Sequence, residues 1–381
     1  MIFYSLLAVG IAFIGPFLKL FIKNKKVERL IEVILCFGVL FAVSAIKADS
    51  VGTDTQAYIE AFNAITSKPF FELRYRSFEP GFVLLYKIFG VAHIPFRGFQ
   101  IFLYLFVYGA LGLFVWKYSK NISFSAFMLI GIGIFGFNLS GQRQALAMAI
   151  CLIGLFVYLQ GKRIFSLIAF IIIVLIGCLF HVTSFVMLLA LFMRKRPLGL
   201  KEYVILMFLV FLVFLLSPSF YQFVLHFVIS SVYYPITTGG GGRFFALTFV
   251  GLFLFIILKT TFVGDLFVKL LPFTKKFDDK EVVVVDQEAV LQETQLKDYM
   301  FFLFIVALLF ESFSTVSNQL TRASMYFMQV FVVLLPNIIA SKKNKIYRIC
   351  LYVGFFAIFF FLFYLTFIRN SSVGIYPYSI M

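Results

Sequence analysis

The sequence predicts an all-α polytopic integral membrane protein with about twelve membrane-spanning helices. Hydrophobic residues make up 62% of the 381 residues, charged residues make up only 13%, and the mean hydropathy is +1.02. This composition excludes a soluble domain with a polar surface. Apolar runs of about 17 to 23 residues recur along the chain, and each can cross roughly 30 Å of hydrocarbon as a helix.

The apolar runs define twelve predicted spans with approximate boundaries. The first of them is not expected to be a signal peptide, because no basic segment precedes it and no Ala-x-Ala site follows it. The spans are 2–22, 30–47, 98–116, 122–140, 144–160, 164–180, 182–193, 202–217, 244–260, 299–317, 321–340 and 346–368.

The charges of the connecting segments predict the orientation. Basic clusters occupy alternate connectors, which the positive-inside rule assigns to the cytoplasm. Both termini then lie outside. These connectors are 23–29, 117–120, 161–163, 194–201, 261–298 and 341–345.

Arginine dominates the basic residues of the predicted outer side. Of the 33 Lys and Arg residues, 23 fall on the inner side and 10 on the outer side, and 7 of those 10 are Arg. Arginine presents a planar fork that matches phosphate and carboxylate oxygens, so this pattern indicates a bound anion. The alternative is that these side chains only snorkel to lipid headgroups.

Three segments outside the spans are long. The predicted outer loop 48–97 is expected to hold a helix over 56–66 and a short helix over 81–90, the latter lying in the membrane interface or re-entrant. A second outer loop is predicted over 217–243. The third segment, 261–298, is expected to be a cytoplasmic loop of mixed charge without chemistry of its own.

Five short motifs occur along the chain in a fixed order. They are Val51-Gly52-Thr53-Asp54-Thr55-x-x-Tyr58, Glu79-Pro80-Gly81-Phe82, Arg143-Gln144-x-Leu146-Ala147, Phe180-His181-x-Thr183-Ser184 and Arg322-x-x-x-Tyr326-Phe327. Together they resemble the EpsG/Wzy-type family of polysaccharide polymerases, over residues of about 45 to 340. The late Tyr376-Pro377-Tyr378 resembles a tail of such proteins.

The resemblance implies a GT-C-like multispan fold in the bacterial inner membrane, with an active site that faces the exterior. It also implies the reaction, in which undecaprenyl-pyrophosphate-linked oligosaccharide repeat units are joined into capsule, O-antigen or exopolysaccharide. The expected partners are this lipid-linked substrate, the bilayer, a chain-length regulator and a flippase. No nucleic acid is expected, since the net charge of +16 is mostly the inner basic set.

A polymerase of this kind must neutralise the charge that develops on the leaving pyrophosphate. Arg143 is the first candidate, because it opens a helix and Gln144 beside it adds a neutral donor. Arg322 and Arg243 also precede predicted spans. Arg74 and Arg76 could bind a second substrate or an acidic sugar, although a solvated loop pair is the alternative. Tyr58 is among the tyrosines that could stack on a sugar.

The reaction also needs a group that removes a proton from the acceptor hydroxyl. The candidates are His181, Asp54 and Glu79. The ordinary pKa of histidine suits general-base catalysis at neutral pH. For each residue a structural role is the alternative: His181 as a hydrogen-bonding residue of a turn, Asp54 as a helix cap, and Glu79 as the partner of an arginine.

No metal and no cofactor are expected. An Asp-x-Asp pair is absent from the predicted outer face, and the four cysteines have neither zinc-site nor CxxC spacing. Activity is therefore expected to resist EDTA.

Two other classes of protein remain open. A flippase or transporter of the same lipid-linked substrate is disfavoured, because the candidate residues gather at one face. An O-acyltransferase would need a buried histidine with an acidic partner and a thioester donor from inside.

Overall fold

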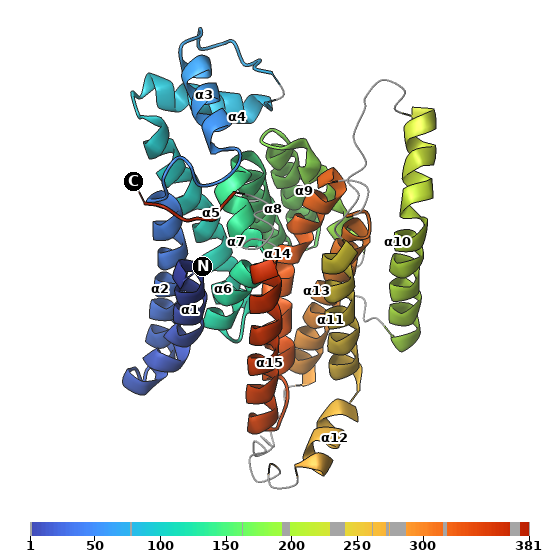
Figure 1. Ribbon diagram of the computed structural model, residues 1–381. Coiled ribbons are helices and arrows are strands. Elements are labelled where there is room, and N and C mark those ends of the chain that lie inside the picture. Colours follow the sequence, from blue (N-terminus) through green and yellow to red (C-terminus); the bar gives the residue numbers. More distant parts are fainter. Residues whose placement is uncertain are drawn as a thin grey trace. The chain divides into compact units, whose positions relative to one another are not determined.

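The regular elements of the computed structural model are helices (Figure 1). The structure describes residues 2–76, 78–161, 163–192, 199–228, 241–260, 262–271, 274, 287–314, 318–365 and 374–380. Two compact units make up the chain, Met1–Leu188 with Phe356–Met381, and Leu189–Phe355. The all-α prediction is confirmed, since the described ranges contain isolated β-bridges but no strand.

The first unit contains nine α-helices and the start of a 3₁₀ helix within the described ranges. Helix α5 is central to their packing, since it contacts α2 on one side and α8 on another (Figure 1). Helices α1 and α2 also contact α6, and α8 contacts α9. The elements are α1 (Ile2–Phe21), α2 (Lys25–Ala45), α3 (Thr55–Thr66), α4 (Pro80–Val91), α5 (Phe96–Tyr118), α6 (Ile122–Gly131), α7 (Ile134–Ser140), α8 (Gln142–Gln160), α9 (Arg163–Cys178) and η1 (Val182–Leu191).

The second unit is built around the long pair α13 and α14, which pack along one another. Stacked rings of Phe304 and Phe331, with centroids 4.3 Å apart, lie in this interface. Helices α10 and α11 both contact α13. The elements are α10 (Leu200–Val228), α11 (Gly241–Lys259), α12 (Phe262–Leu270), α13 (Gln287–Glu311), α14 (Asn318–Ala340) and α15 (Lys345–Phe363), the last of which runs into the first unit.

Among the described residues, fewer helices are long and apolar enough to cross a membrane than the sequence predicted. Within the described residues, five helices are long and apolar enough, namely α1, α5, α8, α14 and α15, and two bent helix pairs raise the count to as many as seven. The twelve-span count and the GT-C-like class are therefore not confirmed. The predicted span 182–193 is a 3₁₀ helix over Val182–Leu191, and α9 has only 16 residues.

The predicted continuous span 122–140 is wrong in one respect, because it is broken into α6 and α7 with a bend of 59°. Gly133 forms the N-cap of α7 with φ of 85°. This left-handed backbone conformation costs glycine little and other residues more, which explains why the helix breaks here. The two short helices form a broken or re-entrant span.

The structure agrees in part with the predictions for the three long segments outside the spans. Helices α3 and α4 agree with the helices expected over 56–66 and 81–90. Helix α10 continues to Val228, into the segment 217–243, whose residues 229–240 lie outside the described ranges. In the segment 261–298, α12 and the start of α13 are helical.

The C-terminal segment 374–380 lies against the start of the chain and the end of α2. The amide of Ala48 donates to the carbonyl of Ser379 (2.9 Å), and the amide of Gly52 donates to the carbonyl of Gly374 (2.8 Å). The hydroxyl of Tyr4 donates to the carbonyl of Ile375 (2.8 Å). These bonds fix the turn that precedes α3.

Candidate functional site

Glu79 joins an arginine and a histidine that are far apart in the sequence. Its Oε2 lies 2.7 Å from Nη1 of Arg143, and its Oε1 lies 3.0 Å from Nδ1 of His181. The three side chains are largely shielded, with 14%, 20% and 15% of Glu79, Arg143 and His181 exposed. Because water screens such a pair only weakly, the charges interact more strongly than they would on an open surface. We call these three residues the Glu79 network.

The start of α4 is shaped to present Glu79. Pro80 occupies the first turn of α4, where its fixed φ suits a helix start, and the extended backbone of Glu79 (ψ 145°) is the conformation favoured before proline. Glu79 is the N-cap residue, so its carboxylate lies at the positive end of the helix dipole.

A close backbone approach holds this helix start against the turn between α9 and η1. The amide of Gly81 donates to the carbonyl of Leu179 (2.9 Å), and a Cβ on Gly81 would lie only 2.7 Å from that oxygen. Only glycine fits this approach. The amide of Val182 in turn donates to Oε1 of Glu79 (3.3 Å), so the turn contributes both the ring of His181 and a backbone donor.

Arg143 lies in the first turn of α8, where a positive charge is unfavourable next to the helix dipole. Glu79 offsets this charge, and the guanidinium carbon stands 4.2 Å from the ring centroid of Phe78. The backbone amide of Arg143 donates to the hydroxyl of Tyr58 (3.4 Å). Burial raises the pKa of Tyr58, so its hydroxyl is neutral at physiological pH. This arginine thus contacts an anionic carboxylate, an aromatic face and a neutral hydroxyl.

The electrostatics of the network set the charge of Glu79. Burial acts to raise the pKa of Glu79, but the hydrogen bond from His181 and the charge of Arg143 outweigh it, so the pKa lies below its ordinary value. Glu79 is therefore ionised at neutral pH and can only accept hydrogen bonds. Nδ1 of His181 must then donate its hydrogen to Oε1 of Glu79, so the ring carries a proton on Nδ1.

Two of the three predicted proton acceptors, Glu79 and His181, are thus brought together, and Asp54 is not. Asp54 occupies the N-cap position of α3 without the side-chain cap bond that the sequence suggested. Among the described residues, its carboxylate accepts from the hydroxyl of Thr53 (3.3 Å), and its amide donates to Ser140 (3.4 Å). Asp54 therefore lies beside the network rather than in it.

The remaining candidates of the first unit differ in exposure. Tyr58 is 6% exposed, so its described contacts are with the site rather than with an open surface. Gln144, which follows Arg143, is also buried. Arg74 and Arg76 are exposed, and the guanidinium of Arg76 lies 5.3 Å from the ring centroid of Tyr75. These two arginines remain predicted substrate ligands.

The other two arginines belong to the second unit. Arg322 is exposed in the first turns of α14. The side chain of Arg243 lies outside the described part of the chain. Glu311, also in the second unit, accepts a hydrogen bond from the hydroxyl of Ser324 (2.8 Å).

Sequence reasoning missed Phe78 and Val182, which complete the site from the positions next to Glu79 and His181. An aromatic residue before a Glu-Pro pair is too common a feature to have indicated a cation–π contact. Outside the site, Arg97 donates to the carbonyls of Ala45 (3.2 Å) and Lys47 (3.0 Å) and pairs with Asp49 (2.8 Å). It closes the C-terminal end of α2.

The helices and the site define a class of protein. Several helices are long and apolar enough to span a bilayer, and one unit carries a shielded Arg–Glu–His network, so the protein is a membrane protein with a polar, ionised site. The chain belongs to the EpsG family, whose model matches residues 30–380 and so covers nearly its whole length. The predicted resemblance is confirmed, and the family indicates a polysaccharide polymerase of the glycosyltransferase kind. No curated protein and no solved structure matches the chain.

Proposed function

We propose that the protein polymerises lipid-pyrophosphate-linked oligosaccharide repeat units at the outer face of a bacterial inner membrane, and that the Glu79 network carries the reaction. The observation that supports this role is the bridge formed by Glu79, which holds a cation and a base in one site. A pyrophosphate-linked donor needs both groups, one for the departing charge and one for the acceptor proton.

In this proposal His181 is the general base. The oxygen of the acceptor hydroxyl forms a bond to the anomeric carbon of the donor glycan while the bond from that carbon to the pyrophosphate oxygen breaks. The acceptor proton passes to Nε2 of His181. Glu79 holds the ring through Nδ1 and stabilises the positive charge that the ring acquires, as a carboxylate does in other hydroxyl-activating sites.

Arg143 binds the leaving pyrophosphate. A guanidinium carries five N–H donors in a planar fork that matches phosphate oxygens, and the described bond to Glu79 is made by Nη1. Phe78 and Glu79 restrict the side chain to one position before substrate binds, which lowers the entropy lost on binding. The other arginines, Arg322, Arg243, Arg74 and Arg76, and the polar Gln144 are proposed to contact phosphate or glycan. Asp54 would contact the acceptor sugar.

Deletion of the gene in its bacterial host tests the reaction. If the protein is a polymerase, the surface glycan loses its ladder of chain lengths, while single repeat units still reach the surface. Loss of all surface glycan, with lipid-linked units accumulating inside the cell, would instead identify a flippase and refute the proposal.

Complementation with Arg143→Ala tests the site. The expected loss of chain extension is on the order of 10²–10³-fold, the effect of removing one donor from a preorganised anionic site. Arg143→Lys keeps the charge but loses the planar fork and should recover only part of the activity. Immunoblots of membrane fractions control for insertion. Long glycan chains in the Arg143→Ala strain would contradict the assignment.

A further inference from the structure

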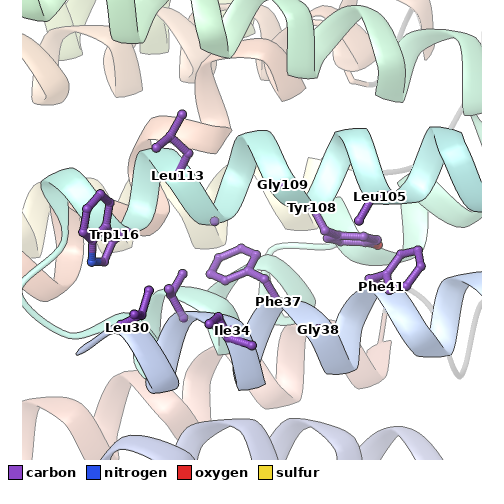
Figure 2. A pocket seen from close by; sticks show the side chains of 12 residues that line it. Leu30, Ile34, Phe37, Gly38, Phe41, Leu105, Tyr108, Gly109, Leu113 and Trp116 are labelled. Carbon is purple, nitrogen blue, oxygen red and sulfur yellow. The ribbon is translucent and has the colours of Figure 1, made fainter. Parts of the chain in front are cut away.

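An apolar groove runs between α2 and α5 on the first unit, and no part of the proposed reaction uses it. It has a volume of about 390 Å³. Figure 2 shows Leu30 and Trp116 at one end of the groove and Phe41 and Tyr108 at the other. The lining residues on α2 extend over about 16 Å of helix, from Leu30 to Phe41, at a rise of about 1.5 Å per residue. The groove is therefore long and narrow.

Glycines open the groove. Positions Gly38 of α2 and Gly109 of α5 line it, and a Cβ added at either would meet no other atom within 4 Å. Gly112 lies where Phe37 packs across from α2. A side chain of ordinary size at Gly38 or Gly109 would fill this space. The hollow thus results from the absence of side chains and not from separated helices, since α2 and α5 pack against each other.

One end of the groove is strongly basic. Trp116 is followed by Lys117, and Leu30 is preceded by Arg29, with Lys25 and Lys26 one turn earlier on α2. Nη2 of Arg29 donates to the carbonyls of Trp116 (2.7 Å) and Ser119 (3.1 Å), which ties the two helix ends together. The three lysines are exposed. An apolar groove therefore ends at four positive charges.

We propose that this groove binds one anionic phospholipid, with an acyl chain between α2 and α5 and the phosphate at Lys25, Lys26 and Lys117. An acyl chain fits the narrow apolar hollow, whereas a packed helix is about 10 Å wide and would meet the exposed Leu30, Leu105 and Trp116 at its rims. The basic end supplies the charge that selects an anionic headgroup over a zwitterionic one. This site goes beyond the proposed polymerase reaction and does not depend on it.

Trp116 reports on this site directly, because it is the only tryptophan in the sequence and it lines the groove. The purified full-length protein is reconstituted in phosphatidylcholine vesicles that contain a minor fraction of lipid with brominated acyl chains, which quench tryptophan fluorescence on contact. Brominated phosphatidylglycerol should quench at a concentration about fivefold lower than brominated phosphatidylcholine, the effect expected of roughly one basic residue near an anionic headgroup. Equal quenching by the two lipids would overturn the proposal.

Two variants separate the groove from general lipid contact. Gly109→Leu fills the groove and should abolish the preference for the anionic lipid, whereas Gly10→Leu, at an equally open glycine of α1, should leave it unchanged. The triple variant Lys25→Ala, Lys26→Ala, Lys117→Ala changes only exposed side chains and should reduce the preference without altering quenching by phosphatidylcholine. Retention of the preference in Gly109→Leu, or in the triple variant, would refute the site.

Discussion

Two shielded glutamates of the first unit, Glu79 and Glu32, have opposite surroundings. Glu79 accepts from the cation Arg143, from the ring of His181 and from a backbone amide. Glu32, in α2, is 5% exposed, and within the described part of the chain its carboxylate accepts from two neutral donors of Ser123, the backbone amide (2.9 Å) and the hydroxyl (2.8 Å). The carboxylate of Glu79 thus contacts groups that can bind an anion or accept a proton, whereas the carboxylate of Glu32 caps a helix.

The surroundings of Glu32 explain its structural role. Its carboxylate binds the first turn of α6, where unpaired backbone N–H groups and the helix dipole favour an anion. The hydroxyl of Ser123 also accepts from the amide of Gly15 in α1 (2.7 Å), and a Cβ at Gly15 would collide with Oε1 of Glu32. One carboxylate thus connects α1, α2 and α6. The two carboxylates are therefore separated by the charge of their partners and not by burial.

The largest expected effect separates the two carboxylates by activity. Glu79→Gln keeps the shape of the side chain but removes the charge that orients His181, so chain extension should fall on the order of 10²-fold or more. The matched variant Glu32→Gln should keep extension within a few-fold of wild type. Glycan ladders from complemented deletion strains measure both, and a similar loss in the two variants would remove the distinction.

The free energy of unfolding should respond in the opposite way, with a larger loss from substitution of Glu32 than of Glu79. Glu32→Ala leaves the amide and hydroxyl of Ser123 without their buried acceptor and should lower the free energy of unfolding by about 1–3 kcal/mol. Glu32→Gln retains an acceptor oxygen and should lose less. Unfolding of the purified protein in mixed detergent–SDS micelles gives both values. If Glu32→Ala is as stable as wild type, the helix-cap role is wrong.

A smaller effect, at acidic pH, sharpens the account of Glu79. Its pKa is lowered in the folded protein, so its ion pairs stabilise the fold fully above the ordinary value of about 4.3 and lose that contribution as the pH falls through the lower folded value. The stability difference between wild type and Glu79→Gln should therefore not decrease as the pH falls from 8 to about 5, and it should vanish only below about 4. A difference that has already vanished near pH 6 would show that the pKa is raised instead.

The sequence supplied chemical reasons for the candidate residues but no information on their arrangement. Arg143, Glu79 and His181 each carry a chemical reason of their own, and a short motif surrounds each of them. Their pairing could not be predicted, because Glu79 lies 64 residues from Arg143 and 102 residues from His181. Tertiary contacts of the start of α4 with α8 and with the α9–η1 turn bring them together. Asp54 had an equally good chemical reason, yet its hydrogen bonds are made elsewhere.

The fold, like the site, could be predicted only in part from the sequence. Helices α3 and α4 were predictable from local turn and proline signals, which act over a few residues. The break between α6 and α7 was not, because Gly133 is one of several glycines in apolar runs and only its left-handed backbone marks the break. Hydropathy likewise could not show the break, since it does not report whether an apolar run is one straight helix.

A double-variant cycle on chain extension tests most directly whether the Glu79 network acts as one catalytic unit. Rates of glycan extension are compared for Glu79→Gln, His181→Asn and the double variant, in reconstituted vesicles supplied with lipid-linked repeat units. If Glu79 acts through His181, the double variant should be no slower than the slower single variant. Losses that multiply in the double variant would show that the two residues act independently and would contradict the account.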